Sequence, residues 1–261
     1  MLTFIEIYIS ELQMPYSSIH THFVSETTST NELAKKLFKE KELNLPFIVQ
    51  TNFQSQGKGQ YLKSWESKAG DNLLFSLVIK APPIDIEKQF DISKAVAVAI
   101  RDVLKKITNA KVCIKWPNDI YVDDDKIAGI LIENTIVGSE IDTCIIGIGL
   151  NVNQTQFSRE LPNPTSIKLI TNTEVNIDFL KSNIASTIIS NLKNLEYSSK
   201  IYDTYLYRKG ELGKFISNKN SEFLGVIIGI DPIGKLRIRI ENNIVETFSN
   251  NEIKFVLPHT N

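Results

Sequence analysis

The sequence has few of the side chains that usually bind a metal ion. Its 261 residues include only two cysteines and three histidines. Cys113 and Cys144 both lie in apolar runs, their spacing matches no zinc-binding pattern, and the histidines are not clustered. We therefore expect no metal site from these residues. We expect both thiols to be buried and reduced, as is usual in a cytoplasmic protein.

Long apolar runs and an excess of one charge are also missing. No stretch approaches the length of a membrane-spanning helix. The N-terminus lacks a basic region followed by an uninterrupted apolar core, which argues against a secretion signal. The formal net charge is −1, so no overall field attracts nucleic acid. We therefore predict a globular protein that binds neither membrane nor DNA.

The chain does contain a mixture of strand and helix patterns. Apolar runs predict strands within residues 20–25, 46–51, 72–79, 112–116 and 141–149. Helical spacing predicts helices from about residue 32, over 86–107 and over 177–207, with a loop and one short helix over 162–173. These patterns indicate an α+β fold, in which helices pack on a mixed central sheet.

The pattern changes at residue 210. Short alternating strands follow, separated by turns at 231–234 and 241–243, which suggests a small β-barrel. We therefore divide the chain into residues 1–209 and 210–261. Lys235, Arg237 and Arg239 alternate on one of these strands. They could form a basic patch for nucleic acid, but a solvated strand face is the simpler explanation.

One segment carries charged residues at the ends of predicted strands. It reads Lys115-Trp-Pro-Asn-Asp119, and Lys126-Ile-Ala-Gly129 follows eleven residues after Lys115. Pro117 has no N–H to donate to a neighbouring strand, and the Asn-Asp pair after it favours a turn. The pattern predicts a hairpin with two lysines and a carboxylate at its strand ends. Spacing alone also fits an ordinary hairpin with solvated ends.

Two further segments could bind a polar ligand. Ser29, Thr30 and Asn31 precede a helix, where Ser29 and Glu32 fit a capping box and where free N–H groups could also hold a ligand. The segment from Gln54 to Trp65 contains a Gly-Lys-Gly turn, whose N–H groups could approach anionic oxygens, although no P-loop pattern is present. Trp65 could be a buried core residue or could cover a ligand held by this loop.

These segments together resemble the biotin–protein ligase family. The most specific part is the Lys115–Asp119 block with Lys126, and the resemblance extends from Ser25 to about Val256. It implies a catalytic domain over residues 1–209 with the fold of class II synthetases and biotin–lipoate ligases. It also implies a C-terminal Src-homology-3-like β-barrel over 210–261, and a monofunctional type without an N-terminal DNA-binding domain.

The resemblance implies an activity and a set of substrates. The expected reaction is the ATP-dependent attachment of biotin to one lysine of a biotin carboxyl carrier protein or domain. It proceeds through biotinyl-5′-AMP with Mg²⁺, in a cytoplasmic enzyme for which a homodimer is an option.

The implied catalytic residues are Lys126, Asp119 and Lys115. The implied biotin-binding residues are Ser29, Thr30, Asn31, Gln54, Lys58, Gly59, Gln60 and Lys126. The implied nucleotide-binding residues are Gly57, Lys58, Lys63, Trp65, Asn118 and Asn151.

The sequence also departs from the family pattern. Lys58 and Gln60 stand where the family most often has arginines, and Leu62 stands at a usual glycine. A lysine cannot grip an anion bidentately as an arginine does, so the loop could hold an acyl-adenylate less tightly. Gly147 and Gly149, which precede Asn151, fit either close strand packing or a border of the nucleotide site. The alternatives are a lipoate–protein ligase, a biotin-responsive repressor and a biotin-binding, non-catalytic homologue.

Overall fold

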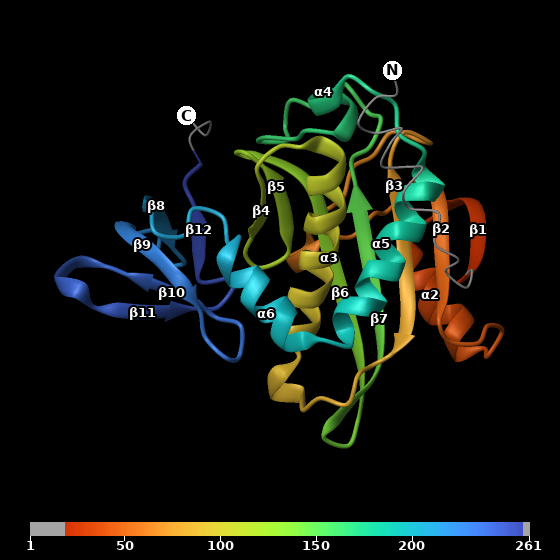
Figure 1. Ribbon diagram of the computed structural model, residues 1–261, viewed down its shortest axis with the longest axis horizontal. Helices are drawn as coiled ribbons and strands as arrows, with labels where there is room; N and C mark the ends of the chain where they lie inside the picture. Colours follow the sequence, from red (N-terminus) through yellow and green to blue (C-terminus); the bar gives the residue numbers. More distant parts are fainter. Residues whose placement is uncertain (1–18, 258–261) are drawn as a thin grey trace.

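The computed structural model describes residues 19–257 and confirms the α+β class. The weakly patterned residues 1–18, on which the expected absence of a DNA-binding domain depends, lie outside the described range. The described part contains a larger and a smaller sheet, and Figure 1 places the smaller one beside the edge of the larger.

The larger sheet is mixed and seven-stranded, in the order β1-β2-β3-β7-β6-β5-β4. Its strands are β1 (His20–Thr27), β2 (Phe47–Gln54), β3 (Leu73–Lys80), β4 (Val112–Lys115), β5 (Asp119–Val122), β6 (Asp125–Val137) and β7 (Glu140–Leu150). Strands β1 and β2 pair in parallel, and the remaining pairs are antiparallel. The predicted hairpin at 112–132 is therefore a three-stranded meander, in which β5 is so short that its pattern is weak.

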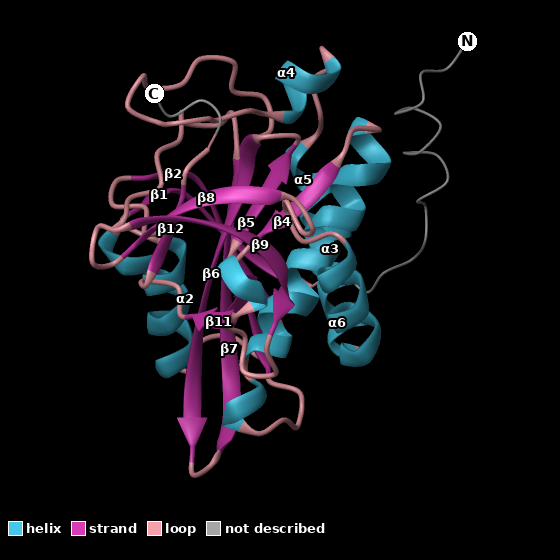
Figure 2. Ribbon diagram, turned by 90° about the vertical axis from the view of Figure 1, so that its left-hand side faces the viewer, coloured by secondary structure: helices cyan, strands magenta, loops and turns pink. Residues whose placement is uncertain are grey.

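Helices cover both faces of this sheet (Figure 2). They are α2 (Thr30–Lys39), α3 (Phe90–Thr108), α4 (Ile167–Thr171), α5 (Ile177–Leu192) and α6 (Leu195–Thr204). Because strand side chains alternate, Ile48 and Ile146 pack towards α3 and α5, while Val49 and Ile145 pack towards α2. Both faces of the central strands are thus buried, which explains their continuous apolar runs.

Two predicted helices are shorter than their apolar patterns suggest. The segment from Ile86 begins with a 3-10 turn (Ile86–Lys88), and α3 starts only at Phe90. The predicted helix over 177–207 is two helices, because Asn194 starts α6 by accepting a hydrogen bond from the N–H of Tyr197. Asparagine side chains favour such caps over a helix interior.

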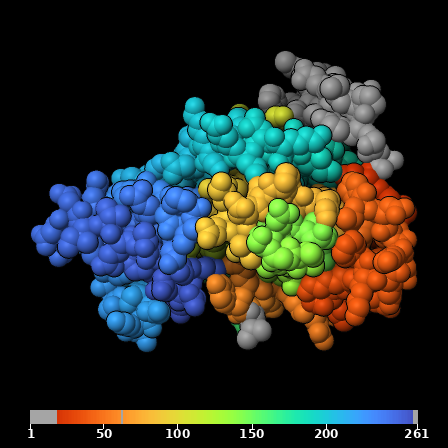
Figure 3. Space-filling view, turned by 90° about the horizontal axis from the view of Figure 1, so that it is seen from below, coloured from red at the N-terminus to blue at the C-terminus, as the bar shows by residue number. Residues whose placement is uncertain are grey.

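The smaller sheet is antiparallel and five-stranded, in the order β11-β10-β9-β8-β12. Its strands are β8 (Leu212–Ser217), β9 (Glu222–Ile230), β10 (Leu236–Arg239), β11 (Val245–Phe248) and β12 (Ile253–Phe255), and the sequence pattern predicted all but the last. Figure 3 shows this C-terminal part, in blue, at one end of the molecule. On β10, Leu236 and Ile238 are fully buried while Arg239 is exposed, as expected for an ordinary half-buried strand.

Hydrogen bonds to backbone carbonyls help to hold the C-terminal part against the larger sheet. The segment 205–207 pairs with β4, since the N–H of Ile114 donates to the carbonyl of Tyr205 and the N–H of Tyr207 donates to the carbonyl of Ile114. The buried Trp116 indole donates through Nε1 to the carbonyl of Gly234, 2.8 Å away, in the turn before β10. Gly234 has φ +91°, and a Cβ there would lie 2.2 Å from the Phe90 ring, so this turn requires glycine.

Candidate active site

A cavity of about 720 Å³ lies on the face of the central sheet that α2 covers. The N-terminus of α2, strands β5, β6 and β7, the glycine-rich loop and the end of the chain form its walls. All the predicted site residues except Gly57 line it. They are Ser29, Thr30, Asn31, Gln54, Lys58, Gly59, Gln60, Lys63, Trp65, Lys115, Asn118, Asp119, Lys126 and Asn151.

A β-bulge between β5 and β6 directs Lys126 into this cavity. Asp119 pairs with Gly129 and Ile120 with Ala128, but Tyr121 pairs with Lys126 rather than with Ile127. The extra residue in β6 therefore turns Lys126 to the face that Asp119 and Tyr121 share. In a regular register Lys126 would point to the opposite face, because one residue of shift reverses every side chain.

Lys126 and Asp119 form an ion pair beside Trp65. Lys126 Nζ lies 2.6 Å from Asp119 Oδ1 and 5.6 Å from the centre of the Trp65 ring. The pair lacks hydrogen-bond alignment, so within residues 19–257 Asp119 Oδ1 is buried without a hydrogen-bond partner. A lysine and a carboxylate in this state can each turn towards a bound ligand.

The loop before α4 fixes the backbone of Lys126. The N–H of Lys126 donates to the carbonyl of Asn163 at 2.7 Å, and the N–H of Thr165 donates to the carbonyl of Lys126 at 3.0 Å. The sequence offered no signal for this contact, because the loop carries no charge pattern and reaches the strand only in the folded chain.

Lys115 lies at the end of β4 between two aromatic rings. Its Nζ is 4.7 Å from the Phe255 ring centre and 5.3 Å from that of Tyr121. Burial lowers the pKa of Lys115 below the usual lysine value, although the Asp119 carboxylate acts in the opposite direction. Phe255 belongs to β12, so the C-terminal sheet forms part of the surroundings of this lysine.

The hydroxyl cluster at the start of α2 lies at the other end of the cavity. Gln54 Oε1 accepts a hydrogen bond from the Thr30 N–H at 2.8 Å and lies 3.1 Å from the Thr30 hydroxyl oxygen. Ser29 occupies the N-cap position, but its side chain makes no capping hydrogen bond, so the predicted capping box is wrong. The reason is that Glu32 pairs with Lys35 and Lys58 instead of turning back to the helix start.

The glycine-rich loop folds over the cavity and closes on itself. The N–H of Trp65 donates to the carbonyl of Gly57 at 2.9 Å, and the N–H of Gly59 donates to the carbonyl of Lys63 at 2.6 Å. Gly57 does not line the cavity. A Cβ at this position would lie 2.5 Å from the Trp65 carbonyl oxygen, so Gly57 permits the close turn of the loop.

Trp65 lies flat over two glycines of the central sheet. Gly129 and Gly149 are paired across β6 and β7, and a Cβ on Gly149 would lie 2.4 Å from the Trp65 ring. A Cβ on Gly147 would likewise lie 2.4 Å from Asn31 Oδ1. These glycines therefore do two things at once: they allow close packing, and they give the cavity its floor.

Two asparagines border the cavity near these glycines. Asn151 donates through Nδ2 to the carbonyl of Thr165 at 2.9 Å, while its buried Oδ1 has no hydrogen-bond partner among residues 19–257. Asn118 donates through its side-chain Nδ2 to the backbone carbonyl of Ile130 at 2.9 Å, and its backbone carbonyl accepts from the Ile130 N–H. Asn118 thus braces the turn, whereas Asn151 keeps an acceptor free.

The charges of the cavity favour an anionic ligand. Five lysines line it but only two carboxylates, those of Glu66 and Asp119. The sequence reasoning missed one of these lysines, Lys254, as well as Asn250, which donates through Nδ2 to Gln60 Oε1. Both come from the C-terminal sheet and its turns. Their sequence neighbours gave no sign of a site, since only the docking of the two sheets brings them to the cavity.

The described part of the chain offers no ready metal site. No group of three or more His, Cys, Asp or Glu side chains within residues 19–257 is arranged to hold a metal ion. Cys113 and Cys144 are buried free thiols, as predicted. No helix in this part is long and apolar enough to cross a membrane.

Comparison with known sequences gives one consistent match. Residues 23–151 match the biotin/lipoate A/B protein ligase family. The bifunctional ligase/repressor BirA of Escherichia coli (strain K12) is 29% identical over 212 residues, which are 77% of this chain and 64% of that protein. A biotin–[acetyl-CoA-carboxylase] ligase of Paracoccus denitrificans is 32% identical over 131 residues, covering 49% of this chain and 53% of that protein. The chain thus spans somewhat under two thirds of the Escherichia coli relative.

Solved structures agree in fold. A biotin protein ligase from Aquifex aeolicus, in complex with biotin and ATP, has a TM-score of 0.73 at 23% identity, and the match covers 91% of this chain and 99% of that one. A biotin protein ligase from Leishmania major, in complex with biotinyl-5-AMP, has a TM-score of 0.64 at 21% identity, covering 89% and 100%. At these identities the likeness establishes the shared fold.

Proposed function

Because residues 23–151 match the biotin/lipoate A/B protein ligase family, we propose that the protein attaches biotin to a lysine of a biotin carboxyl carrier protein through biotinyl-5′-AMP. One observation carries this proposal. A single cavity joins a neutral pocket of hydroxyl and amide groups to an end rich in lysines. This arrangement suits a ligand with an uncharged polar ring at one end and a carboxylate that must meet a polyphosphate at the other.

The biotin ring would occupy the pocket at the start of α2. Thr30 and Gln54 are held there by the hydrogen bond from the Thr30 N–H to Gln54 Oε1, and Ser29 also lines the cavity. Lys58, Gly59 and Gln60 would close over the ligand from the glycine-rich loop. Asn31 would act from behind this wall, because both ends of its amide already have protein partners.

ATP would occupy the other end. The free Oδ1 of Asn151 can accept a hydrogen bond from the 6-amino group of adenine, and Trp65 offers a ring for the base. Lys63 and Lys115 would neutralise the phosphates, and Asn118 and Gly57 would hold the turn and the loop in place. Mg²⁺ would come with the nucleotide, since this ion is commonly held by substrate phosphates and one or two carboxylates.

Lys126 lies between the two ends. In the first step an oxygen of the biotin carboxylate attacks the α-phosphorus, and the bond to the pyrophosphate oxygen breaks. Lys126 would contact both the carboxylate and the α-phosphate and offset their repulsion, and such fixed charges supply much of the catalysis in phosphoryl-type transfers.

In the second step the acceptor amine attacks the acyl carbon, and the bond to AMP breaks. The amine must lose a proton, because a lysine with its usual pKa is mostly protonated at neutral pH. Asp119, next to Lys126, would take this proton or orient the amine. Replacing Asp119 with Asn should then slow transfer from preformed biotinyl-5′-AMP, and an unchanged transfer rate would refute this role.

We also propose that the chain consists of two domains with different roles. Residues 1–209 would form the catalytic domain, and residues 210–261 would form a C-terminal domain that completes the cavity wall. The two buried free thiols support a reducing compartment such as the cytoplasm. A homodimer stays a prediction.

A transfer assay tests the function. Purified protein, Mg-ATP and an apo carrier domain would be incubated with biotin or with lipoate, and the product read by intact mass. We expect a gain of one biotin, which requires ATP and falls at least about 100-fold in Lys126→Ala, the usual loss when a charge-stabilising donor is removed. A gain of lipoate instead would assign the protein to lipoate transfer. A folded protein that transfers neither would be a binding homologue.

A further inference from the structure

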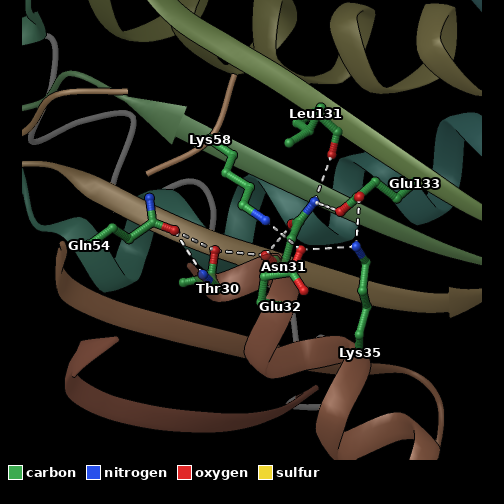
Figure 4. Close-up of polar contacts among 9 residues, drawn as sticks. Thr30, Asn31, Glu32, Lys35, Gln54, Lys58, Leu131 and Glu133 are labelled. Carbon is green, nitrogen blue, oxygen red and sulfur yellow. Dashed lines mark hydrogen bonds and ion pairs between the residues drawn. The ribbon is translucent and has the colours of Figure 1, made fainter. Parts of the chain in front are cut away.

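A chain of hydrogen bonds extends from the hydroxyl pocket, where it is buried, to the partly exposed Glu133 and Lys35 (Figure 4). Asn31 donates through Nδ2 to Glu133 Oε2 at 2.7 Å and to the carbonyl of Leu131 at 3.3 Å. Lys35 Nζ lies 2.7 Å from the other oxygen of Glu133. Ser76 on β3, which is fully buried, lies 2.6 Å from Asn31 Oδ1 and 2.7 Å from the Thr30 hydroxyl oxygen.

The partners fix the orientation of the Asn31 amide. A carboxylate paired with a lysine and a backbone carbonyl can only accept hydrogen bonds, so the NH₂ group must face Glu133 and Leu131. The amide oxygen therefore faces Ser76. An amide oxygen cannot donate, so the single proton of the Ser76 hydroxyl is committed to Asn31.

The position of one more proton follows. With its own proton committed, Ser76 can only accept from Thr30, 2.7 Å away. The single Thr30 hydroxyl proton therefore lies between the two hydroxyls and not on the longer, 3.1 Å line to Gln54 Oε1. Gln54 Oε1 then receives the Thr30 N–H, and the Gln54 NH₂ group is turned away from this contact. The lone pairs of the Thr30 hydroxyl remain for the cavity, which Thr30 lines.

We propose that Glu133, Asn31 and Ser76 form a polarity relay that sets the Thr30 hydroxyl as a hydrogen-bond acceptor. An acceptor at this position selects a ring that presents an N–H, as a cyclic urea does. A dithiolane ring offers no N–H. Glu133, Asn31 and Ser76 are positioning residues for ligand choice, and this reading rests on biotin being the ligand proposed above.

A double-mutant cycle on biotin binding tests the relay. Biotin titrations by calorimetry would use the full chain, as wild type, Ser76→Ala, Thr30→Val and the double variant, with the KM for ATP measured in parallel. Ser198→Ala is the matched control, since Ser198 is an equally buried serine that bonds only to the backbone of α5 and the loop before α6.

The relay predicts that the losses of biotin affinity in the two single variants do not multiply in the double variant. Ser76→Ala should weaken biotin binding about 10-fold, because the Thr30 proton is freed to turn away. In the Thr30→Val background the same change should cost less than about twofold, because coupled residues are not additive. The KM for ATP should stay within about twofold in Ser76→Ala, and Ser198→Ala should bind biotin as the wild type does.

Three results would overturn the relay: losses that multiply, a KM for ATP that rises as much as the biotin affinity falls, or no loss in Ser76→Ala. If Ser76→Ala does not fold, Ser76→Cys keeps the side-chain size with a weaker donor and acceptor and enters the same cycle. A wild-type protein that binds no biotin would refute the proposed function itself, which separates the two failures.

Discussion

At the scale of single residues, several side chains of the cavity have groups whose bonding or charge is not fully satisfied within the protein. Asn151 keeps an acceptor, the Lys126–Asp119 pair lacks hydrogen-bond alignment, and Lys115 is a cation that burial makes easier to deprotonate. Each of these states costs stability in the free protein, because a buried polar group without a partner is unfavourable. We infer that ligand binding recovers part of this cost.

Lys115 gives a prediction about pH. Its pKa is lowered by burial, so its charge is present below that lowered pKa and is lost at a lower pH than for an ordinary lysine, near 10.4. The KM for ATP should therefore begin to rise at a pH below that value. Lys115→Arg, which stays charged, should move this rise to higher pH, as adenylation assays across alkaline pH would measure.

The lowered pKa of Lys115 also affects stability: a rise in pH that weakens ATP binding should increase the free energy of unfolding. Unfolding restores the ordinary pKa of Lys115, so the unfolded chain binds more protons between the two pKa values. This residue's contribution to the free energy of unfolding therefore increases with pH across that window. Urea unfolding of wild type and Lys115→Met at several alkaline pH values would detect it, and parallel curves would contradict the assignment.

At the scale of elements, the site depends on irregularities within regular strands. The bulge opposite Tyr121 turns Lys126 into the cavity, and the glycine pair of β6 and β7 leaves room for Trp65. The bulge and Gly129 lie where the sequence was most specific, in the block from Lys115 to Gly129, whereas Gly149 lies on β7. The sheet thus supplies a rigid base whose defects place the reactive groups.

Gly149→Ala tests the role of the glycine floor. The new methyl group would lie 2.4 Å from the Trp65 ring, so the indole must leave its position. We expect the KM for ATP to rise about 10-fold while the biotin affinity changes less, because Thr30 and Gln54 lie at the other end. Titrations with each ligand would measure this. An unchanged KM for ATP would mean that Trp65 does not contact the nucleotide.

The sequence predicted these elements unevenly, for physical reasons. Most strands and the start of α2 were found, because apolar periodicity reports burial directly. The bulge was missed, since one extra residue barely changes that periodicity. The break before α6 was missed because Asn194 is a single residue, and the Ser29 capping box was wrong because Glu32 has lysine partners. The C-terminal wall with Lys254 depends on docking, which no local pattern records.

At the scale of the whole molecule, the two sheets act as one unit around the cavity. Trp116, in the most specific motif of the chain, is bound to the Gly234 turn rather than to the cavity alone, and Asn250 contacts Gln60 of the glycine-rich loop. The C-terminal part therefore contacts the site through these two hydrogen bonds, in addition to Phe255 and Lys254. We infer that its docking and the shape of the cavity are coupled.

Paired tryptophan substitutions test this coupling. Trp116→Phe leaves the Gly234 carbonyl without its buried donor, which should lower the free energy of unfolding by about 1–3 kcal/mol. Trp65→Phe makes the same chemical change at an indole whose Nε1 has no partner within residues 19–257, so it should affect stability less. Urea unfolding would compare them. Equal losses would show that the bond to Gly234 adds nothing.

The strip of chain at 205–207 also bears on how this protein could be divided for engineering. It covers the backbone of Ile114 on β4, which would otherwise be an open edge of the larger sheet. A fragment ending at residue 204 would expose that edge, and exposed edges recruit strands from other chains and lead to aggregation. A fragment that keeps residues 205–209 would carry its own cover. A split reporter or a chimaera should therefore be cut after this strip, not before it.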